Sequence, residues 1–283
     1  MCDLNNVCDL KICVLGTDDR SKFLRKLYLD EVGKLYSFES ADVIIGPTPF
    51  SKDDVKVNGE SLICDELVEI LKNSSKVLYA GSISNNLKTK LKRKKVNFFD
   101  ILEQDGVAIL NAIPTAEGAI SVAMNITDCT IHNSNSLILG YGNIGKILSK
   151  MLYGIGANVY CEARNKKDIA FINAMGYNSI SLEEIDKYLS NMDIIFNTIP
   201  SLILDEKRLK LLKPDCAIID LASSPGGVDF SAAKELNINT TWSLALPTKI
   251  APKTAALYQK NIIDKLVKRG WLYEWTKRNF NWC

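Results

Sequence analysis

Short apolar runs rich in valine and isoleucine alternate along the chain with segments whose apolar residues recur at helical spacing. This alternation is typical of parallel strands joined by crossover helices. In the first half it predicts strands at 10–15, 42–45 and 76–80 and helices at 20–29, 65–71 and 86–95.

The second half repeats the same unit more regularly. It predicts strands at 136–139, 158–161, 193–198, 216–221 and 240–244. Helices are predicted at 143–153, 167–175, 183–189, 206–212 and 230–235. The fold class is therefore α/β, with two Rossmann-like, doubly wound parallel-sheet domains and an interdomain cleft.

The repeat also suggests where the domains begin and end. The connection between the halves is predicted as one long helix over 114–127, with Pro114 in its first turn, where a missing N–H costs little. The expected parts are an N-terminal Rossmann- or flavodoxin-like domain on the substrate side (1–115), a connecting helix (116–133), an NAD(P)-binding Rossmann domain (134–250), and a C-terminal helix returning to the first domain with an aromatic tail (251–283).

The end of the chain is rich in aromatic side chains. Such residues are favoured anchors of interfaces, and packing onto the protein's own first domain would bury them equally well. The tail is therefore compatible with a homo-oligomer, a different partner protein or an internal contact. The residues are Trp271, Tyr273, Trp275, Phe280 and Trp282.

Composition narrows the class of protein. Of 283 residues, 47% are hydrophobic and 24% charged, and the net charge of +2 provides no global field for nucleic acid or a membrane surface. The basic run at 88–95 is interpreted as the solvated face of a helix. With one histidine and no C-x-x-C pair, no metal site is expected. Neither a signal peptide nor a membrane span is apparent, so we expect a cytoplasmic protein.

A glycine-rich motif follows the first strand of the second half. Residues 137–145 are a buried strand, then G-x-G-x-x-G, then a helical pattern. Gly140 permits the tight turn, Gly142 lets the backbone approach a pyrophosphate, and Gly145 lets the helix pack on its strand. Free N–H groups at the start of the helix, at Asn143 and Ile144, would face the phosphates.

The end of the next strand bears on the choice of cofactor. An acid there binds the ribose 2′-hydroxyl of NAD, whereas a basic neighbour accommodates the 2′-phosphate of NADP. If Ala163 holds the place of the acid, Arg164 can bind the phosphate and NADP is favoured. If the strand stops one residue sooner, Glu162 binds the ribose and NAD is the cofactor. Arg164 would then be a solvated surface cation.

Two further strand ends supply small polar residues to the same crevice. We assign Asn197, Thr198, Ile199, Pro200, Leu221 and Ala222 to the ribose and nicotinamide, and Ser224 to the substrate. Each of these loops could equally be an ordinary turn.

Two lysines near the end of the second half could hold an anionic substrate. Lys249 and Lys253 lie in a proline-stiffened loop before the last helix, where they could pair with a small dicarboxylate or stay solvated. Thr115 and the first-turn Glu117 lie where the connecting helix is expected to begin, and its N–H groups could bind an anion. Our hypothesis is that both lysines and this helix start hold a dicarboxylate between the domains. No catalytic residue is assigned.

Long strings of residues resemble the family of dipicolinate synthase A subunits of spore-forming bacteria. They lie at 108–119, 130–132, 140–145, 196–200, 219–223, 225–227 and 251–255. The resemblance implies oxidation of dihydrodipicolinate to pyridine-2,6-dicarboxylate with NADP as hydride acceptor, a flavoprotein-like B subunit of dipicolinate synthase as partner, and expression in the mother cell during sporulation. The chain departs from the family pattern at Asn143, Ala245 and Thr248.

Two other functions stay open at this point. One is a second kind of small-acid NAD(P) dehydrogenase, for which a Lys-Asp pair or a catalytic histidine would be expected. Neither is evident, and His132 is interpreted as structural. The other is a nucleotide-binding scaffold without catalytic activity that serves a flavoprotein-like partner.

Overall fold

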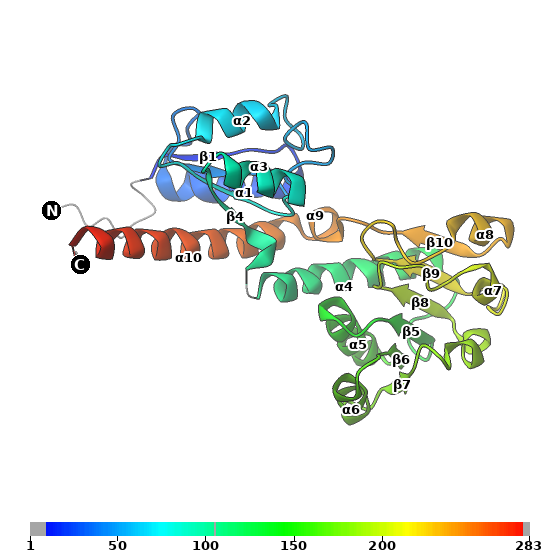
Figure 1. Cartoon of the computed structure of the whole chain (residues 1–283). Coiled ribbons are helices and arrows are strands. Elements are labelled where there is room, and N and C mark those ends of the chain that lie inside the picture. The colour runs from blue at the N-terminus through cyan, green and yellow to red at the C-terminus, as the bar shows by residue number, and fades with distance from the viewer. Residues whose placement is uncertain (1–9, 105, 280–283) are drawn as a thin grey trace. The chain divides into compact units, whose positions relative to one another are not determined.

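The chain folds as two separate α/β units (Figure 1). The computed structural model describes residues 10–104 and 106–279, with side chains through residue 268. The first unit combines Met1–Ala108 with Ala251–Cys283, and the second is Ile109–Ile250. Each contains one parallel sheet, so the predicted pair of Rossmann-like domains is confirmed.

The first unit has a parallel sheet in the order β1-β2-β3-β4. Its strands are β1 (Ile12–Val14), β2 (Val43–Ile45), β3 (Val77–Ala80) and β4 (Asn97–Asp100). The other side of β1 is also covered, because the Tyr36 N–H donates to the Ile12 carbonyl at 2.9 Å. The chain therefore passes to one side of β1 and then to the other, as in flavodoxin-like sheets.

Helices cover both faces of this sheet. Alternate residues of each strand point to opposite faces, so Ile12 and Val14 pack on one side and Cys13 and Leu15 on the other. The first side carries α1 (Asp19–Val32) and α10 (Pro252–Asn279), and the second carries α2 (Cys64–Leu71) and α3 (Asn85–Arg93). The aromatic side chains of the tail lie outside the described residues.

The second unit has six parallel strands in the order β10-β9-β8-β5-β6-β7. From β5 the chain moves outward through β6 and β7, and it then returns to the other side of β5 through β8, β9 and β10. The direction therefore reverses between β5 and β8. The strands are β5 (Asn135–Leu139), β6 (Asn158–Glu162), β7 (Asn178–Ile180), β8 (Ile194–Asn197), β9 (Ala217–Asp220) and β10 (Asn239–Trp242).

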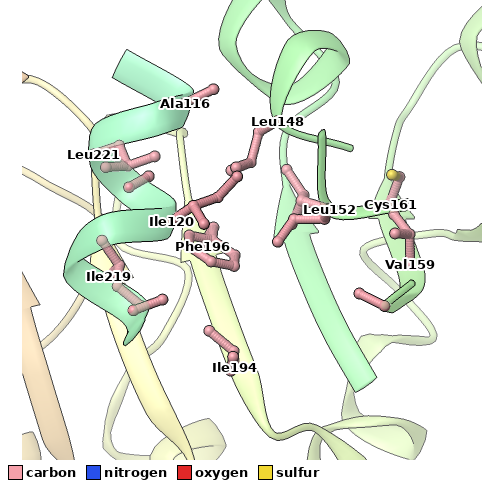
Figure 2. Packing of buried hydrophobic residues seen from close by; sticks show 14 of the residues in the cluster. Ala116, Ile120, Leu148, Leu152, Val159, Cys161, Ile194, Phe196, Ile219 and Leu221 are labelled. Carbon is pink, nitrogen blue, oxygen red and sulfur yellow. The ribbon is translucent and has the colours of Figure 1, made fainter. Parts of the chain in front are cut away.

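One face of this sheet carries the longest helices of the unit. Figure 2 shows Ile120 and Leu148 reaching over Phe196 in the middle of the sheet. These helices are α4 (Val107–Ile126), α5 (Asn143–Ile155) and α6 (Lys166–Ala174). The other face carries shorter elements: η3 (Ile185–Lys187), η4 (Leu189–Asn191), α7 (Glu206–Leu209) and α8 (Phe230–Glu235). The helix predicted over 183–189 is therefore wrong, since two 3-10 turns stand there.

The connecting helix begins earlier than predicted. It starts at Val107, and Pro114 lies inside it rather than in its first turn. A proline there lacks one helical N–H, and the apolar residues before it still continue the helical pattern. Among the described residues α4 is the one helix that could cross a membrane by length and composition alone. Its buried residues Ala116, Ala119 and Ala123 pack in the core of the second unit, as expected of a core helix.

The stiffened loop predicted before the last helix is also wrong. Residues Leu246–Ile250 form the short helix α9, and α10 begins at Pro252. Pro247 and Pro252 both lie in first turns, where proline is tolerated because the N–H is not needed. The two prolines therefore begin helices instead of stiffening a loop.

Candidate functional site

The glycine loop joins β5 to α5 where the strands of the second sheet have their carboxyl ends. Gly140 has φ +91, a conformation that side chains rarely adopt, and a Cβ there would lie 2.6 Å from Thr198 Oγ1. A Cβ on Gly145 would collide with the carbonyl oxygen of Gly140. Both positions therefore need glycine for the fold of the loop itself.

Gly142 is surrounded differently. It is the residue before the first turn of α5, and no described side chain caps this helix. Apart from its own chain neighbours, no heavy atom of the described residues lies within 4 Å of where its Cβ would be. The N–H groups of Asn143, Ile144 and Gly145 therefore begin a helix beside open space, as a pyrophosphate requires. The loop fits a dinucleotide.

Glu162 lies underneath this loop. It is the last residue of β6 and 1% exposed, and its Oε2 accepts a hydrogen bond from the Gly140 N–H at 3.1 Å. Its Oε1 is buried without a hydrogen-bond partner among the described residues. Burial raises the pKa of Glu162, against smaller opposing effects of Arg164 and the Gly140 N–H. The carboxyl group thus supports the loop from inside.

Arg164 lies two residues further on and is exposed. No described residue forms a hydrogen bond or ion pair with it, whereas nearby Lys146 pairs with Asp168 at 3.0 Å. Asn165 begins α6 by accepting a hydrogen bond from the Asp168 N–H. Arg164 is therefore a cation available to a ligand at the end of β6.

The side chains at the ends of β8 and β9 bind each other. Asn197 and Asp220 are both fully buried, and Asn197 Nδ2 donates to Asp220 Oδ1 at 2.8 Å. Asp220 also accepts from the N–H groups of Ala222 at 3.0 Å and Gly227 at 2.8 Å. This network shapes both loops from within. Sequence reasoning did not single out Asp220, although an acid ending an apolar strand was a signal of this role.

The remaining predicted cofactor residues differ in exposure. Thr198 Oγ1 donates to the Leu139 carbonyl at 2.8 Å, so this hydroxyl joins the two strands. Pro200 is exposed, Ile199 half-buried, and Leu221 and Ala222 are buried. The Ala222 carbonyl accepts from the indole N–H of Trp242 at 2.9 Å. The N–H groups of Leu221 and Ala222 donate to the Asn197 carbonyl and to Asp220, so these residues shape the loop from within.

The anion site expected at the start of the connecting helix is wrong. Thr115 lies inside α4, and its Oγ1 donates to the Asn111 carbonyl at 2.7 Å. Because the helix begins at Val107, the N–H groups near Thr115 and Glu117 lie within the helix rather than at its free end. Glu117 itself is exposed.

The other predicted substrate residues lie in different elements. Ser224 is exposed in the loop after β9. Lys249 lies in α9 of the second unit and Lys253 in α10 of the first, and both are exposed.

Solved structures show which family has this architecture. The chain matches a crystal structure of dipicolinate synthase, A chain, from Bacillus subtilis with a TM-score of 0.83 and 30% identity, covering 92% of this chain and 96% of that one. The chain belongs to the family of dipicolinate synthase A subunits. A second member of this family, from Bacillus halodurans, matches with a TM-score of 0.81 and 28% identity over 91% of this chain and 97% of that one.

Sequence comparison agrees with this family. The A subunit of dipicolinate synthase from Bacillus subtilis is 40% identical over 195 residues, which span 68% of this chain and 64% of that relative, slightly under two thirds of its length. Residues 115–228 match the NAD binding domain of D-isomer specific 2-hydroxyacid dehydrogenases. This stretch contains the glycine loop, Glu162, Arg164 and the ends of β8 and β9. The second unit of this family member is therefore a dehydrogenase-type domain for a nicotinamide dinucleotide.

Proposed function

We propose that this chain is an NADP-dependent dehydrogenase that oxidises dihydrodipicolinate to pyridine-2,6-dicarboxylate in the cytoplasm of a sporulating cell. The observation that carries the proposal is the glycine loop open at Gly142, on a sheet whose direction reverses beside it. It stands in a chain similar over nearly its whole length to the A chain of dipicolinate synthase.

The choice of NADP rests on the two charged residues at the end of β6. Glu162 is buried and accepts from the Gly140 N–H, so it offers no exposed carboxylate to a ribose hydroxyl. Arg164 is exposed, and no other described side chain competes for it with a hydrogen bond or ion pair. A guanidinium is well suited to charge-assisted hydrogen bonds with a phosphate. This arrangement supports the 2′-phosphate of NADP over the free hydroxyl of NAD.

The chemistry asks little of side chains as acids or bases. When bound, NADP supplies a hydride acceptor, and loss of hydride from a dihydropyridine ring leaves an aromatic product. The protein then has to hold a C–H bond in position and provide cations for the carboxylates. Ser224, Lys249 and Lys253 remain the proposed substrate contacts in the two units.

The test is a turnover assay with the purified chain, alone and together with the proposed flavoprotein-like partner, the B subunit. The product of dihydrodipicolinate synthase is supplied with NADP or with NAD, and absorbance of the reduced cofactor is followed. We expect reduction of NADP to be faster than that of NAD. No reduction of either cofactor, with or without the partner, would contradict an enzymatic role.

One observation favours a second function. The only histidine of the chain, His132, has its Nδ1 within 3.0 Å of the Ile155 carbonyl and packs against Gly156, so its ring is in structural use. A dehydrogenase that needs a histidine as acid or base would lack one. If the reaction does require such a group, the chain is a nucleotide-binding scaffold for the flavoprotein-like partner. Binding of NADP without turnover under all these conditions would support this alternative.

A further inference from the structure

The first unit holds a buried arginine at the carboxyl edge of its sheet. Arg20 is 6% exposed and lies in the first turn of α1, the helix that follows β1. Its Nη2 donates to the carbonyl of Thr48, in the loop that follows β2. The guanidinium thus joins the ends of two neighbouring strands.

These two loops lie at the point where the strand order of the first sheet reverses. From β1 the chain crosses to the edge segment at Tyr36 and then returns to β2 on the other side of β1. In open α/β sheets, ligands bind outside the carboxyl ends of the strands at such a reversal. Arg20 therefore lies where the topology places a ligand.

Most of the donors of this guanidinium are free. Arginine has five N–H donors, and both described contacts, with Thr48 and with Asp18 at 3.8 Å, involve Nη2. Within the described part of the chain, Nε and Nη1 have no hydrogen-bond partner. Among the described residues, the fully buried side-chain atoms that lack a partner are Thr48 Oγ1 and Glu162 Oε1, and these two nitrogens are not among them. Nε and Nη1 therefore keep a small exposed area in a side chain that is 7% exposed.

Asp18 is the acid that faces this guanidinium: its Oδ2 lies 3.8 Å from Nη2, and its Oδ1 accepts from the Ser21 N–H at 2.7 Å. A buried cation is costly unless it is well paired, and this single ion pair is long. The side of the guanidinium that carries Nε and Nη1 therefore favours an anionic ligand. Burial also lowers the pKa of Arg20, as expected of a cation that has lost solvent.

Arg25 provides a contrast within the same helix. Its Nε donates to the Val14 carbonyl at 3.3 Å and its Nη2 to the Gly16 carbonyl at 2.6 Å. Both of its contacts are backbone carbonyls at the end of β1 and in the loop after it, so this arginine holds the loop. Arg20 and Arg25 therefore support the same edge, but only Arg20 keeps two nitrogens without partners among the described residues.

We infer that Arg20 binds a carboxylate group of the substrate, as a charge-assisted anchor at the carboxyl edge of the first sheet. The inference rests on the proposed function for the identity of the ligand, a pyridine dicarboxylate. Nε and Nη1 can each donate a charge-assisted hydrogen bond to a carboxylate oxygen, whereas a lysine offers only a point charge. Arg20 would thus be a binding residue contributed by the first unit.

The test is calorimetric titration of the full-length chain with pyridine-2,6-dicarboxylate and, separately, with NADP. We compare Arg20→Gln, Arg20→Lys and the control Arg25→Gln, and record the unfolding temperature of each. Arg20→Gln should weaken the dicarboxylate about 10- to 100-fold and leave NADP within about twofold. Arg20→Lys should fall between, and Arg25→Gln should keep dicarboxylate binding within about threefold.

The outcomes separate this inference from the proposed function. Equal dicarboxylate binding by the wild type and a folded Arg20→Gln overturns the inference and leaves the function standing. A wild type that does not bind the dicarboxylate at millimolar concentration also overturns it. If Arg20→Gln loses dicarboxylate binding and the wild type does not bind NADP, the result supports the role of Arg20 and contradicts the proposed cofactor. If Arg20→Gln does not fold, Arg20→Lys decides, and binding equal to the wild type overturns the inference.

Discussion

Three glycines of one loop are required for different physical reasons. Gly140 needs a positive φ, Gly145 needs room for the carbonyl of Gly140, and Gly142 has open space where a side chain would be. Only Gly142 can accept a methyl group without a clash in the protein. The motif therefore contains positions required for folding and one position required for a ligand.

This difference predicts separate effects of two substitutions. Gly142→Ala should keep the unfolding temperature of the wild type and weaken NADP at least about tenfold, because the methyl group occupies the space that a pyrophosphate approaches. Gly145→Ala should lower both the unfolding temperature and the affinity. Thermal unfolding and calorimetric titration of both variants provide the measurement. Unchanged NADP affinity in Gly142→Ala would place the phosphates elsewhere.

Arg164 provides a test of cofactor choice. Arg164→Ala should weaken NADP roughly 10- to 100-fold and NAD by less than about threefold, since charge-assisted hydrogen bonds to the 2′-phosphate are lost. Fluorescence titration with each nucleotide measures both affinities. Lys167→Ala, which removes an exposed cation from the first turn of α6, is the matched control. Equal weakening of both nucleotides by Arg164→Ala would refute the assignment.

Glu162 should make stability depend on pH. Its folded-state pKa is raised by burial, so the folded protein binds this proton more tightly than the unfolded chain. The resulting stabilisation is present below the ordinary pKa of 4.5 and is lost as pH rises through the raised value. The glutamine of Glu162→Gln cannot lose a proton. As pH rises through this window, the unfolding temperature of the variant should therefore increase relative to that of the wild type.

The change per pH unit has an upper limit for one proton. It cannot exceed about 1.4 kcal/mol per pH unit in the free energy of unfolding. Chemical unfolding at a series of pH values measures it. Glu117→Gln, at an exposed position, should run parallel to the wild type. The same parallel behaviour in Glu162→Gln would show that Glu162 titrates alike in the folded and unfolded states.

At the scale of elements, α4 shows how packing explains an apolar helix. Its composition alone would allow it to cross a membrane. Its small residues Ala116, Ala119 and Ala123 are fully buried in the core that includes Phe196. The apolar character of α4 follows from this contact.

The complete burial of these alanines predicts that a larger side chain will be resisted. Ala123→Leu should lower the free energy of unfolding by about 1–3 kcal/mol, because a close-packed core accommodates added methyl groups only by shifting. Met124→Leu, at a position 56% exposed, should change it by less than about 0.5 kcal/mol. Chemical unfolding of both variants compares them. Equal stabilities would mean that α4 does not pack closely against the sheet.

At the scale of the whole molecule, the two units are built from different stretches of chain. The second is continuous, whereas the first needs residues from both ends of the chain. Its apolar face is completed by α10 through Ala256, Ile262, Ile263, Leu266 and Val267. The predicted interdomain cleft, flavoprotein-like partner and homo-oligomer stay predictions.

This arrangement predicts the effect of truncation. A chain ending at Ile250 should lose the folded first unit, because one face of its sheet is uncovered, and should still bind NADP through the second unit. Binding of a hydrophobic dye should rise, and thermal unfolding should lose the transition of the first unit. A chain ending at Lys268 keeps these α10 residues and should unfold like the full-length protein. Unchanged unfolding after truncation at Ile250 would contradict the role of α10.

Local pattern determined much of the fold. Apolar runs and helical spacing located most strands and helices, and the glycine spacing after Leu139 located the nucleotide loop. These signals are readable because they arise between residues close in sequence. Strand β4 was missed because only Asp100 in it is buried, so the apolar signal is weak.

Only the tertiary structure decided which polar groups meet. Whether Glu162 faces a ligand or the Gly140 N–H, and whether Arg20 is solvated or buried beside Thr48, depends on segments some 20 to 30 residues apart in sequence. Periodicity reports which face of an element is buried, but not which distant group lies opposite. The sequence by itself therefore determined the architecture and the nucleotide loop. The tertiary structure decided which charged side chains around the sheet and the nucleotide loop are buried and which groups they bind. Burial and pairing arise only when separate strand ends come together.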